Sequence, residues 1–314
     1  MENGSSVGTS LVLLGIYEME EFKYLYSGSF LALYLSITML SLMIVFVILT
    51  EESLHGPMYI LICNLTLNGI FGTSAFFPRL IYDLFSSSKT ISYYGCITQM
   101  YCIVTFTYFE ICTFTIMAYD RYLAVCHPLQ YVILMTNEKT LKAILGTLAT
   151  TLIAVFIAVL LTSRLPLCGT QIKNIFCDNM SIVILSCVDS TANNLYGTIS
   201  ATSFLLVTSL VIAYTYFKIF LVCINLSKDG HNKAFHVLVT HLLNFSIFLI
   251  GLLFSFVRYR LNSANLPLSL HVLLSITRFV YPPLLNPLIY GLRTKPLKIK
   301  IVYHFSKISM IKNI

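Results

Sequence analysis

Few residues in this apolar sequence are able to do chemistry, and two of them are adjacent. Asp120 and Arg121 stand side by side at the end of a long apolar stretch. A carboxylate beside a guanidinium forms charge-assisted hydrogen bonds and can exchange partners, which suits a switch. The simpler interpretation is a pair of helix-end charges that reach water at a membrane surface.

Glu110 is the second residue of this kind, and it lies inside the same apolar stretch. If the stretch is helical, Glu110 lies about 16 Å from Arg121. That depth is near the middle of a membrane, where a bare charge costs about 3 kcal/mol or more. The carboxyl group is therefore expected either to be neutral or to be held by a cation.

The nine cysteines fall into two sets, and none has the C-x-x-C spacing of a zinc or redox site. Cys96, Cys168, Cys177 and Cys187 border or occupy the loops on one predicted side. In an oxidising compartment these four favour two disulfides, with three pairings possible. The other five lie in or near apolar stretches and are expected to be buried apolar residues.

Composition excludes a disordered chain and an ordinary soluble domain. Of the 314 residues, 57% are hydrophobic and only 11% are charged. The sequence contains no Gly-rich phosphate loop, H-E-x-x-H or G-x-S-x-G motif, so we expect no enzyme activity. The net charge of +7 is spread along the chain as expected for a cytosolic membrane face, and it does not indicate nucleic-acid binding.

Seven apolar stretches are long enough to cross a bilayer as helices, so an all-α membrane protein is predicted. They are unbroken, unlike the alternating segments of a transmembrane barrel. The spans are expected at Tyr26–Leu49, Met58–Tyr82, Thr98–Ala118, Leu141–Thr162, Tyr196–Cys223, Phe235–Val257 and Leu268–Leu292.

The distribution of lysine and arginine residues indicates the orientation of this predicted seven-helix bundle in the membrane. With the N-terminus outside, the cytosolic segments hold twelve of the twenty lysine and arginine residues, although Glu51 and Glu52 oppose this bias. Residues 1–25 are then extracellular, 26–292 form the transmembrane domain and 293–314 are a cytoplasmic tail. Asn3 begins a glycosylation sequon in the extracellular segment. A multi-pass protein of the plasma membrane is predicted.

Four ordered motifs give the chain a family resemblance. The run from Met117 reads MAYDRYLAVCHPLQY, and the run from Leu54 reads LHGPMY. Later, Lys233-Ala234-Phe235 leads to His241-Leu242, and PPLLNPLIY follows from Pro282. Together these resemble the signatures of odorant receptors, a branch of the rhodopsin-like G-protein-coupled receptors. The run CNLTLNG from Cys63 looks most like that of fish members.

The resemblance implies a function and a set of switch residues. An odorant receptor binds a small molecule and activates a stimulatory, olfactory-type G protein, which raises cyclic AMP. Tyr214 and Tyr290 would turn toward Arg121 when the sixth helix swings outward. Pro287 frees a backbone group that the Asn286 side chain can bind. The implied switch residues are Asp120, Arg121, Tyr122, Tyr214, Asn286, Pro287 and Tyr290.

Two further expectations depend on the resemblance. The disulfides are expected to join Cys96 to Cys177 and Cys168 to Cys187. Asn68 and Asn286 are expected to share a sodium ion with Glu110, which would modulate the receptor. Because Asn68 supplies no second carboxylate, a neutral Glu110 stays the alternative. No other cofactor is expected.

A ligand pocket is predicted in the outer part of the bundle, below the disulfide-linked loop. The third span has no carboxylate at this depth and the seventh has no lysine, which disfavours amine and retinal ligands. The candidate lining is apolar with a few hydroxyls: Ile103, Val104, Thr107, Tyr108, Thr198, Thr202, Leu252, Leu253, Phe256 and Phe279.

Two other functions are weighed against an odorant receptor. A rhodopsin-like receptor for a peptide or a lipid would show the same switch motifs, and only a ligand panel separates it. A transporter is less favoured because many transporters contain a repeated half-structure with broken helices, and no internal repeat is found.

Overall fold

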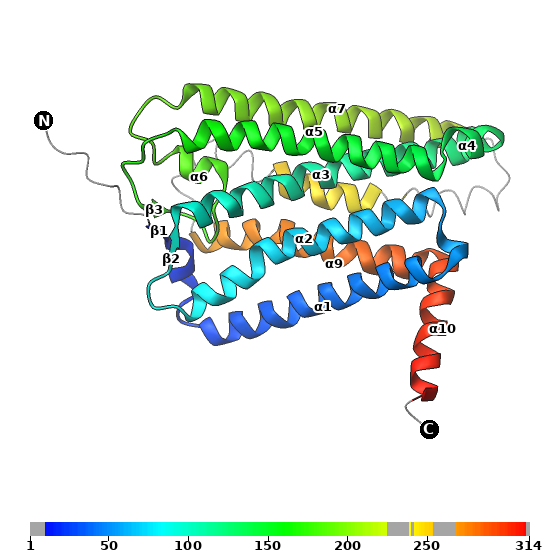
Figure 1. Cartoon of the computed structure of the whole chain (residues 1–314), viewed down its shortest axis with the longest axis horizontal. Coiled ribbons are helices and arrows are strands. Elements are labelled where there is room, and N and C mark those ends of the chain that lie inside the picture. The colour runs from blue at the N-terminus through cyan, green and yellow to red at the C-terminus, as the bar shows by residue number, and fades with distance from the viewer. Residues whose placement is uncertain (1–9, 225–238, 240–241, 254–267, 312–314) are drawn as a thin grey trace, which may run out of the picture.

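The computed structural model describes residues 10–224, 239, 242–253 and 268–311, and its long helices run side by side (Figure 1). Five of the described helices are long and apolar enough to cross a membrane. With the shorter apolar helix Leu242–Leu253 and α9, they correspond to the seven predicted spans. The long helices are α1 (Lys23–Thr50), α2 (Pro57–Phe85), α3 (Tyr93–Cys126), α5 (Asn137–Ser163), α7 (Thr191–Ile224) and α9 (Leu268–Arg293).

Local sequence explains where several helices begin. The Ser92 hydroxyl accepts a hydrogen bond from the Gly95 amide and caps α3, and Thr136 caps α5 in the same way. Pro57 opens α2, where its missing N–H group costs nothing. Three prolines lie inside α9, including Pro287, and the helix nevertheless continues to Arg293.

Buried apolar side chains form two clusters along the bundle. The inner cluster packs the cytosolic halves of α1, α2, α3 and α7 around residues such as Met117 and Tyr290. The outer cluster contains Phe76, Phe106 and Phe279 together with buried residues of the outer loops. Many large apolar side chains remain exposed on the outside of the helices, as expected for surfaces that face lipid.

The structure confirms the two expected disulfides. Cys96 is bonded to Cys177, with 5.3 Å between their Cα atoms, and Cys168 is bonded to Cys187, with 5.1 Å. The first bond joins the start of α3 to the loop between α5 and α7. The second bond lies within that loop. Cys63, Cys102, Cys112, Cys126 and Cys223 are free, and all are buried or half-buried.

Part of the predicted extracellular segment, residues 10–19, forms a strand and a short helix. Strand β1 (Ser10–Leu13) lies between β2 (Thr90–Ser92), to which it is antiparallel, and β3 (Gln171–Ile172), to which it is parallel. The 3-10 helix η1 (Leu14–Met19) follows and contacts α9 and α2. The strand thus links the first and second extracellular loops.

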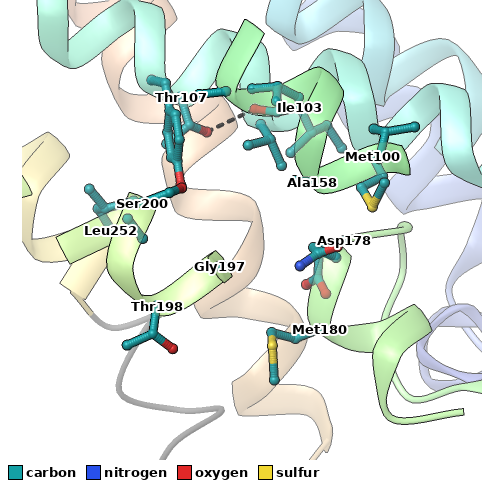
Figure 2. Close-up of a pocket in the computed structure, with 17 residues that line it drawn as sticks. Met100, Ile103, Thr107, Ala158, Asp178, Met180, Gly197, Thr198, Ser200 and Leu252 are labelled. Carbon is teal, nitrogen blue, oxygen red and sulfur yellow. Dashed lines mark hydrogen bonds between the residues drawn. The ribbon is translucent and has the colours of Figure 1, made fainter. Parts of the chain in front are cut away.

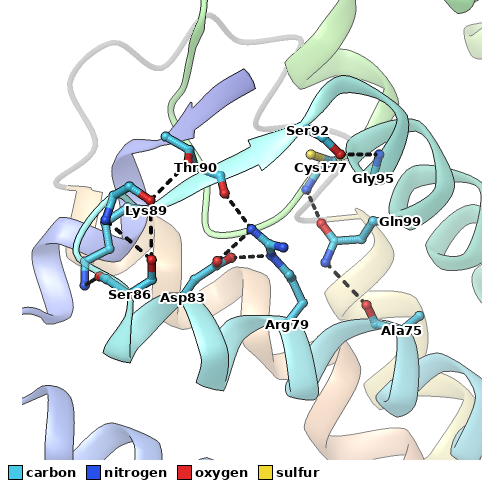
Figure 3. A network of polar contacts seen from close by, with 11 residues as sticks. Ala75, Arg79, Asp83, Ser86, Lys89, Thr90, Ser92, Gly95, Gln99 and Cys177 are labelled. Atoms are coloured by element: carbon cyan, nitrogen blue, oxygen red, sulfur yellow. Dashed lines mark hydrogen bonds and ion pairs between the residues drawn. The ribbon is translucent and has the colours of Figure 1, made fainter. Parts of the chain in front are cut away.

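Ion pairs anchor this small sheet to the bundle (Figure 3). Arg79 pairs with Asp83 one turn further along α2 and donates a 2.6 Å hydrogen bond to the Thr90 carbonyl. Lys89 is only 2% exposed, and its Nζ lies 2.8 Å from Glu20 Oε2. Lys23 binds the other oxygen of Glu20 at 3.1 Å. Glu20 therefore connects η1, the first extracellular loop and α1.

We expect Glu20→Gln to lower the melting temperature of the purified receptor, because the buried Lys89 ammonium loses its carboxylate. Hydrogen bonds from Lys89 and Lys23 lower the pKa of Glu20. This stabilisation is therefore present above the ordinary pKa of a glutamate and is lost as the pH falls through the lowered value. The Gln variant should lack that acid-dependent step in a thermal-shift measurement.

A matched control is Glu138→Gln, which removes the pair with Lys142. Both of those side chains are more than 70% exposed, so the melting temperature should stay unchanged. Equal shifts for the two variants would contradict the role given to Glu20.

The predicted cytoplasmic tail is largely helical. Helix α10 (Lys295–Ile311) follows α9 and leaves the bundle at a steep angle (Figure 1). Glu51, at the end of α1, lies 2.5 Å from Lys300 Nζ and 3.0 Å from His304 Nε2. The acid that opposed the charge bias is thus paired within the cytosolic face. Shorter helices are η2 (Glu52–Leu54), α4 (Pro128–Leu134) and α6 (Asn179–Val183).

Candidate ligand cavity and cytosolic switch

A cavity of about 170 Å³ lies in the outer half of the bundle, between α3, α5, α7 and the loop helix α6 (Figure 2). The position agrees with the expectation from the sequence. Six of the ten candidate ligand residues line it: Ile103, Val104, Thr107, Tyr108, Thr198 and Leu252.

Three other candidates do not line this cavity. Thr202 lies one turn deeper along α7, and its hydroxyl donates to the Thr198 carbonyl. Leu253 is 40% exposed. Phe279 is fully buried and stacks on Phe76 at 4.3 Å between ring centroids, so packing with α2 takes up its ring. Phe256 lies outside the described residues.

One wall of the cavity was missed from the sequence. Ala154 and Ala158 lie one turn apart on α5 and contribute to the lining, as do Val155 and Val159. Residues at this spacing share one helix face. Small residues four apart were the available signal, but similar residues also occur on lipid-facing surfaces, so the spacing alone does not indicate a pocket.

The polar groups that line the cavity differ in the hydrogen bonds that they already make within the protein. Tyr108 and Ser200 share a hydrogen bond of 3.0 Å between α3 and α7. Thr107 and Thr198 donate instead to carbonyls of their own helices. Asp178 accepts from the Ser181 amide and from Asn174 Nδ2. The cavity is therefore apolar with one shared hydroxyl pair that joins two helices.

The Asp120 and Arg121 pair is present at the cytosolic end of α3. Arg121 Nε donates to Asp120 Oδ2 at 2.9 Å, and Arg121 Nη2 binds the same oxygen. The Tyr131 hydroxyl, on α4, donates to Asp120 Oδ1 at 2.8 Å. Asp120 is fully buried, so both of its oxygens are held away from water. The carboxylate thus ties Arg121 to the second cytosolic loop.

The tyrosines around this pair differ from the expected set. Tyr290 is buried, whereas Tyr214 is 55% exposed and its ring lies 6.3 Å from that of Tyr122. Tyr216 is only 7% exposed and belongs to the inner apolar cluster, which also contains Tyr290. Two residues turn a helix by about 200°, so both tyrosines of α7 cannot face inward. Tyr216, not Tyr214, lies inside the bundle.

Glu110 lies between the two apolar clusters and is fully buried. Asn68 Nδ2 donates to its Oε2 at 2.6 Å, and Asn286 Nδ2 donates to its Oε1 at 2.9 Å. Asn244, on the helix Leu242–Leu253, donates to Asn286 Oδ1 at 3.2 Å. These contacts join four helices. The Asn286 side chain therefore binds Glu110 and Asn244, whereas the sequence had indicated that it binds the backbone group freed by Pro287.

The sodium expectation is only partly supported by this arrangement. Glu110, Asn68 and Asn286 do lie together, but both amides present N–H groups to the carboxylate, whereas hard cations take oxygen ligands. Asn68 Nδ2 also donates to the Phe106 carbonyl at 3.1 Å, which fixes the orientation of that amide. The residues in this arrangement do not fit a bound sodium ion.

We therefore expect the receptor to be indifferent to sodium. Exchange of sodium for choline at constant ionic strength should change neither odorant potency nor melting temperature, because amide donors already satisfy Glu110. Constant ionic strength is needed because surface charges respond to screening. A sodium-dependent gain in melting temperature that disappears in Glu110→Gln would contradict this expectation.

The apolar helix bundle, with an outer cavity and an inner Asp-Arg pair, defines a seven-helix membrane receptor. Comparison with known protein sequences identifies the family. The profile of the family described as olfactory receptor matches residues 30–307. Human olfactory receptor 52B6 is 31% identical over 299 residues, covering 95% of this chain and 89% of its own. Human olfactory receptor 2AT4 is 32% identical over 292 residues, covering 92% and 90%.

The chain belongs to the olfactory receptor family. It is accordingly an odorant receptor of the plasma membrane that signals through a G protein to cyclic AMP, and it is not an enzyme. These two relatives are human proteins, and the likeness of the run from Cys63 to fish members stays a prediction. Glycosylation of Asn3, which lies outside the described residues, also stays a prediction.

Proposed function

We propose that this receptor detects small, uncharged and largely apolar odorants in the α3, α5 and α7 cavity and signals through a stimulatory, olfactory-type G-protein α subunit. The observation that carries the proposal is the composition of the cavity. Its described lining contains no lysine or arginine, and the one carboxylate, Asp178, already accepts two hydrogen bonds. An anionic ligand would lose its hydration there without a cationic partner, and a cationic ligand would have to compete with the two hydrogen bonds that Asp178 already accepts.

The same helix connects the cavity with the switch. Thr107 and Tyr108 line the cavity, and Arg121 lies about 20 Å further along α3. A ligand shifts the receptor toward its active state only through a difference in affinity for the two states. Contacts to α3 and α7 supply such a difference if the two helices move relative to each other. Membrane lipids contact the exposed apolar side chains of the helices.

The test is a cyclic AMP assay in cells that lack endogenous stimulatory α subunits. Cells that receive the receptor with the olfactory-type α subunit should respond to uncharged odorants, and cells that receive an inhibitory α subunit should not. A response carried only by the inhibitory subunit, or one limited to charged ligands, would contradict the proposal.

A further inference from the structure

We infer that Tyr108 and Ser200 form the specificity element of the cavity and select odorants that carry a hydrogen-bond acceptor, such as an aldehyde or ketone carbonyl. The inference rests on the proposed function and adds the chemical class of the ligand. It starts from the hydrogen bond between the two hydroxyls, which are 3.0 Å apart and belong to different helices.

One hydroxyl proton of the pair is not used in the hydrogen bond between the two side chains. Whichever hydroxyl donates within the pair, the other keeps its own proton, because each hydroxyl carries one donor and two acceptor sites. Among the described residues the two side chains have no other hydrogen-bond partner. One donor therefore stays available to a molecule in the cavity that both residues line.

The other hydroxyls of the lining lack this property. Thr107 donates to the Ile103 carbonyl at 2.9 Å, and Thr198 donates to the Asn194 carbonyl at 2.5 Å. A threonine bonded to its own helix has no proton left for a ligand. These groups can accept, but they do not distinguish a carbonyl from an alkyl group by donation.

The outer end of the cavity reinforces the preference. Asn179 lines the cavity, and its Oδ1 accepts from the Thr162 hydroxyl at 2.7 Å. Its Nδ2 end is therefore the part left to donate. Asp178 beside it is occupied as an acceptor by Ser181 and Asn174. Each end of the cavity thus offers a donor, one hydroxyl of the Tyr108 and Ser200 pair and the Asn179 amide, to match an acceptor on the ligand.

Packing holds the hydroxyl pair in place. The Tyr108 ring stacks on Phe204 of α7 with 4.6 Å between centroids, which limits its rotation. Figure 2 shows Ser200 and Leu252 on one side of the cavity and Asp178 and Met180 on the other. A ligand whose acceptor meets the pair can therefore extend its alkyl part toward the loop helix α6.

The test is a series with one seven-carbon skeleton: heptanal, heptanol, heptane, heptanoate and heptylamine. Recruitment of a G protein to the receptor is recorded beside cyclic AMP. The wild type should respond best to heptanal, more weakly to heptane, and least to the two charged compounds. Equal potency of heptane and heptanal would overturn the inference, as would a response to the charged compounds alone or to none of the series.

Tyr108→Phe removes the Tyr108 hydroxyl and keeps the ring, so it tests the contribution of the hydrogen-bond donor alone. Without its partner, Ser200 can turn to its own helix, as Thr198 and Thr202 do. Heptanal potency should fall about tenfold, the value of roughly one hydrogen bond, while heptane potency stays unchanged. Ser200→Ala leaves the Tyr108 proton free and should retain the preference for heptanal. Thr202→Val is the matched control, because that hydroxyl lies outside the cavity.

The outcomes separate this inference from the proposed function. An equal fall for heptanal and heptane in Tyr108→Phe would overturn the role of the hydroxyl pair while the receptor still raised cyclic AMP. Recruitment of an inhibitory subunit without cyclic AMP, but with the heptanal preference intact, would instead contradict the proposed function. If Tyr108→Phe does not reach the surface, the ranking of the series on the wild type still decides.

Discussion

Replacing Arg121 with alanine is expected to abolish the odorant-evoked rise in cyclic AMP while the receptor still reaches the cell surface. Arg121 is about one-fifth exposed at the inner end of α3, and its guanidinium is held by Asp120. The cation contributes little to the apolar clusters, so folding should survive its loss. Signalling should not, because no other side chain at that position can exchange partners when the helices move. Surface staining and cyclic AMP are measured in the same cells.

Replacement of its partner, Asp120, is expected to give the opposite result. Asp120→Asn removes the negative charge that holds the Arg121 guanidinium, so we expect Arg121 to be released and basal cyclic AMP to rise. Tyr131→Phe removes one of the hydrogen bonds and should give a smaller rise. Lys142→Ala, at an exposed cytosolic site, is the control and should change neither the basal nor the odorant-evoked cyclic AMP level. Normal odorant responses from Arg121→Ala at full surface expression would refute the role of the pair.

We expect Cys96→Ser to remove most of the receptor from the cell surface. Its bond to Cys177 closes a sequence separation of 81 residues, against 19 for Cys168 and Cys187. The chain-entropy model gives about 4.5 kcal/mol for the first closure and about 3.2 kcal/mol for the second. Cys168→Ser should therefore have the weaker effect. The measurement is surface expression by flow cytometry.

Burial adds to the effect of the first bond. Cys96 and Cys177 are both fully buried, and the Cys177 amide donates to Gln99 at 2.9 Å. In Cys96→Ser, the Cys177 thiol and the new hydroxyl lie without a bond in the outer apolar cluster, and the loop that forms the wall of the cavity is freed. Cys102→Ser, at a free cysteine on the same helix, should reach the surface normally. Labelling of Cys96 by a thiol reagent in the mature receptor would contradict the bond.

The sequence alone determined the membrane-spanning class and the family, and it favoured one orientation. These follow from the length of apolar stretches, the distribution of lysine and arginine, and motifs such as that around Asp120, all of which are local properties of the chain. The cysteines show the limit of local reasoning, because four of them allowed three pairings. The family resemblance gave the pairing that the structure confirms.

Only the tertiary structure decided which face of each helix points inward. In a membrane, apolar residues cover the lipid-facing and the inward-facing sides alike, so hydrophobic periodicity does not show the buried face. For this reason the buried position of Tyr216 and the α5 wall of the cavity were missed, while the movement of Tyr214 toward Arg121, which the resemblance implies, stays a prediction. The orientation of the amides around Glu110 and the pairing of β1 with two distant loops depend on neighbours from other segments, which no local pattern specifies.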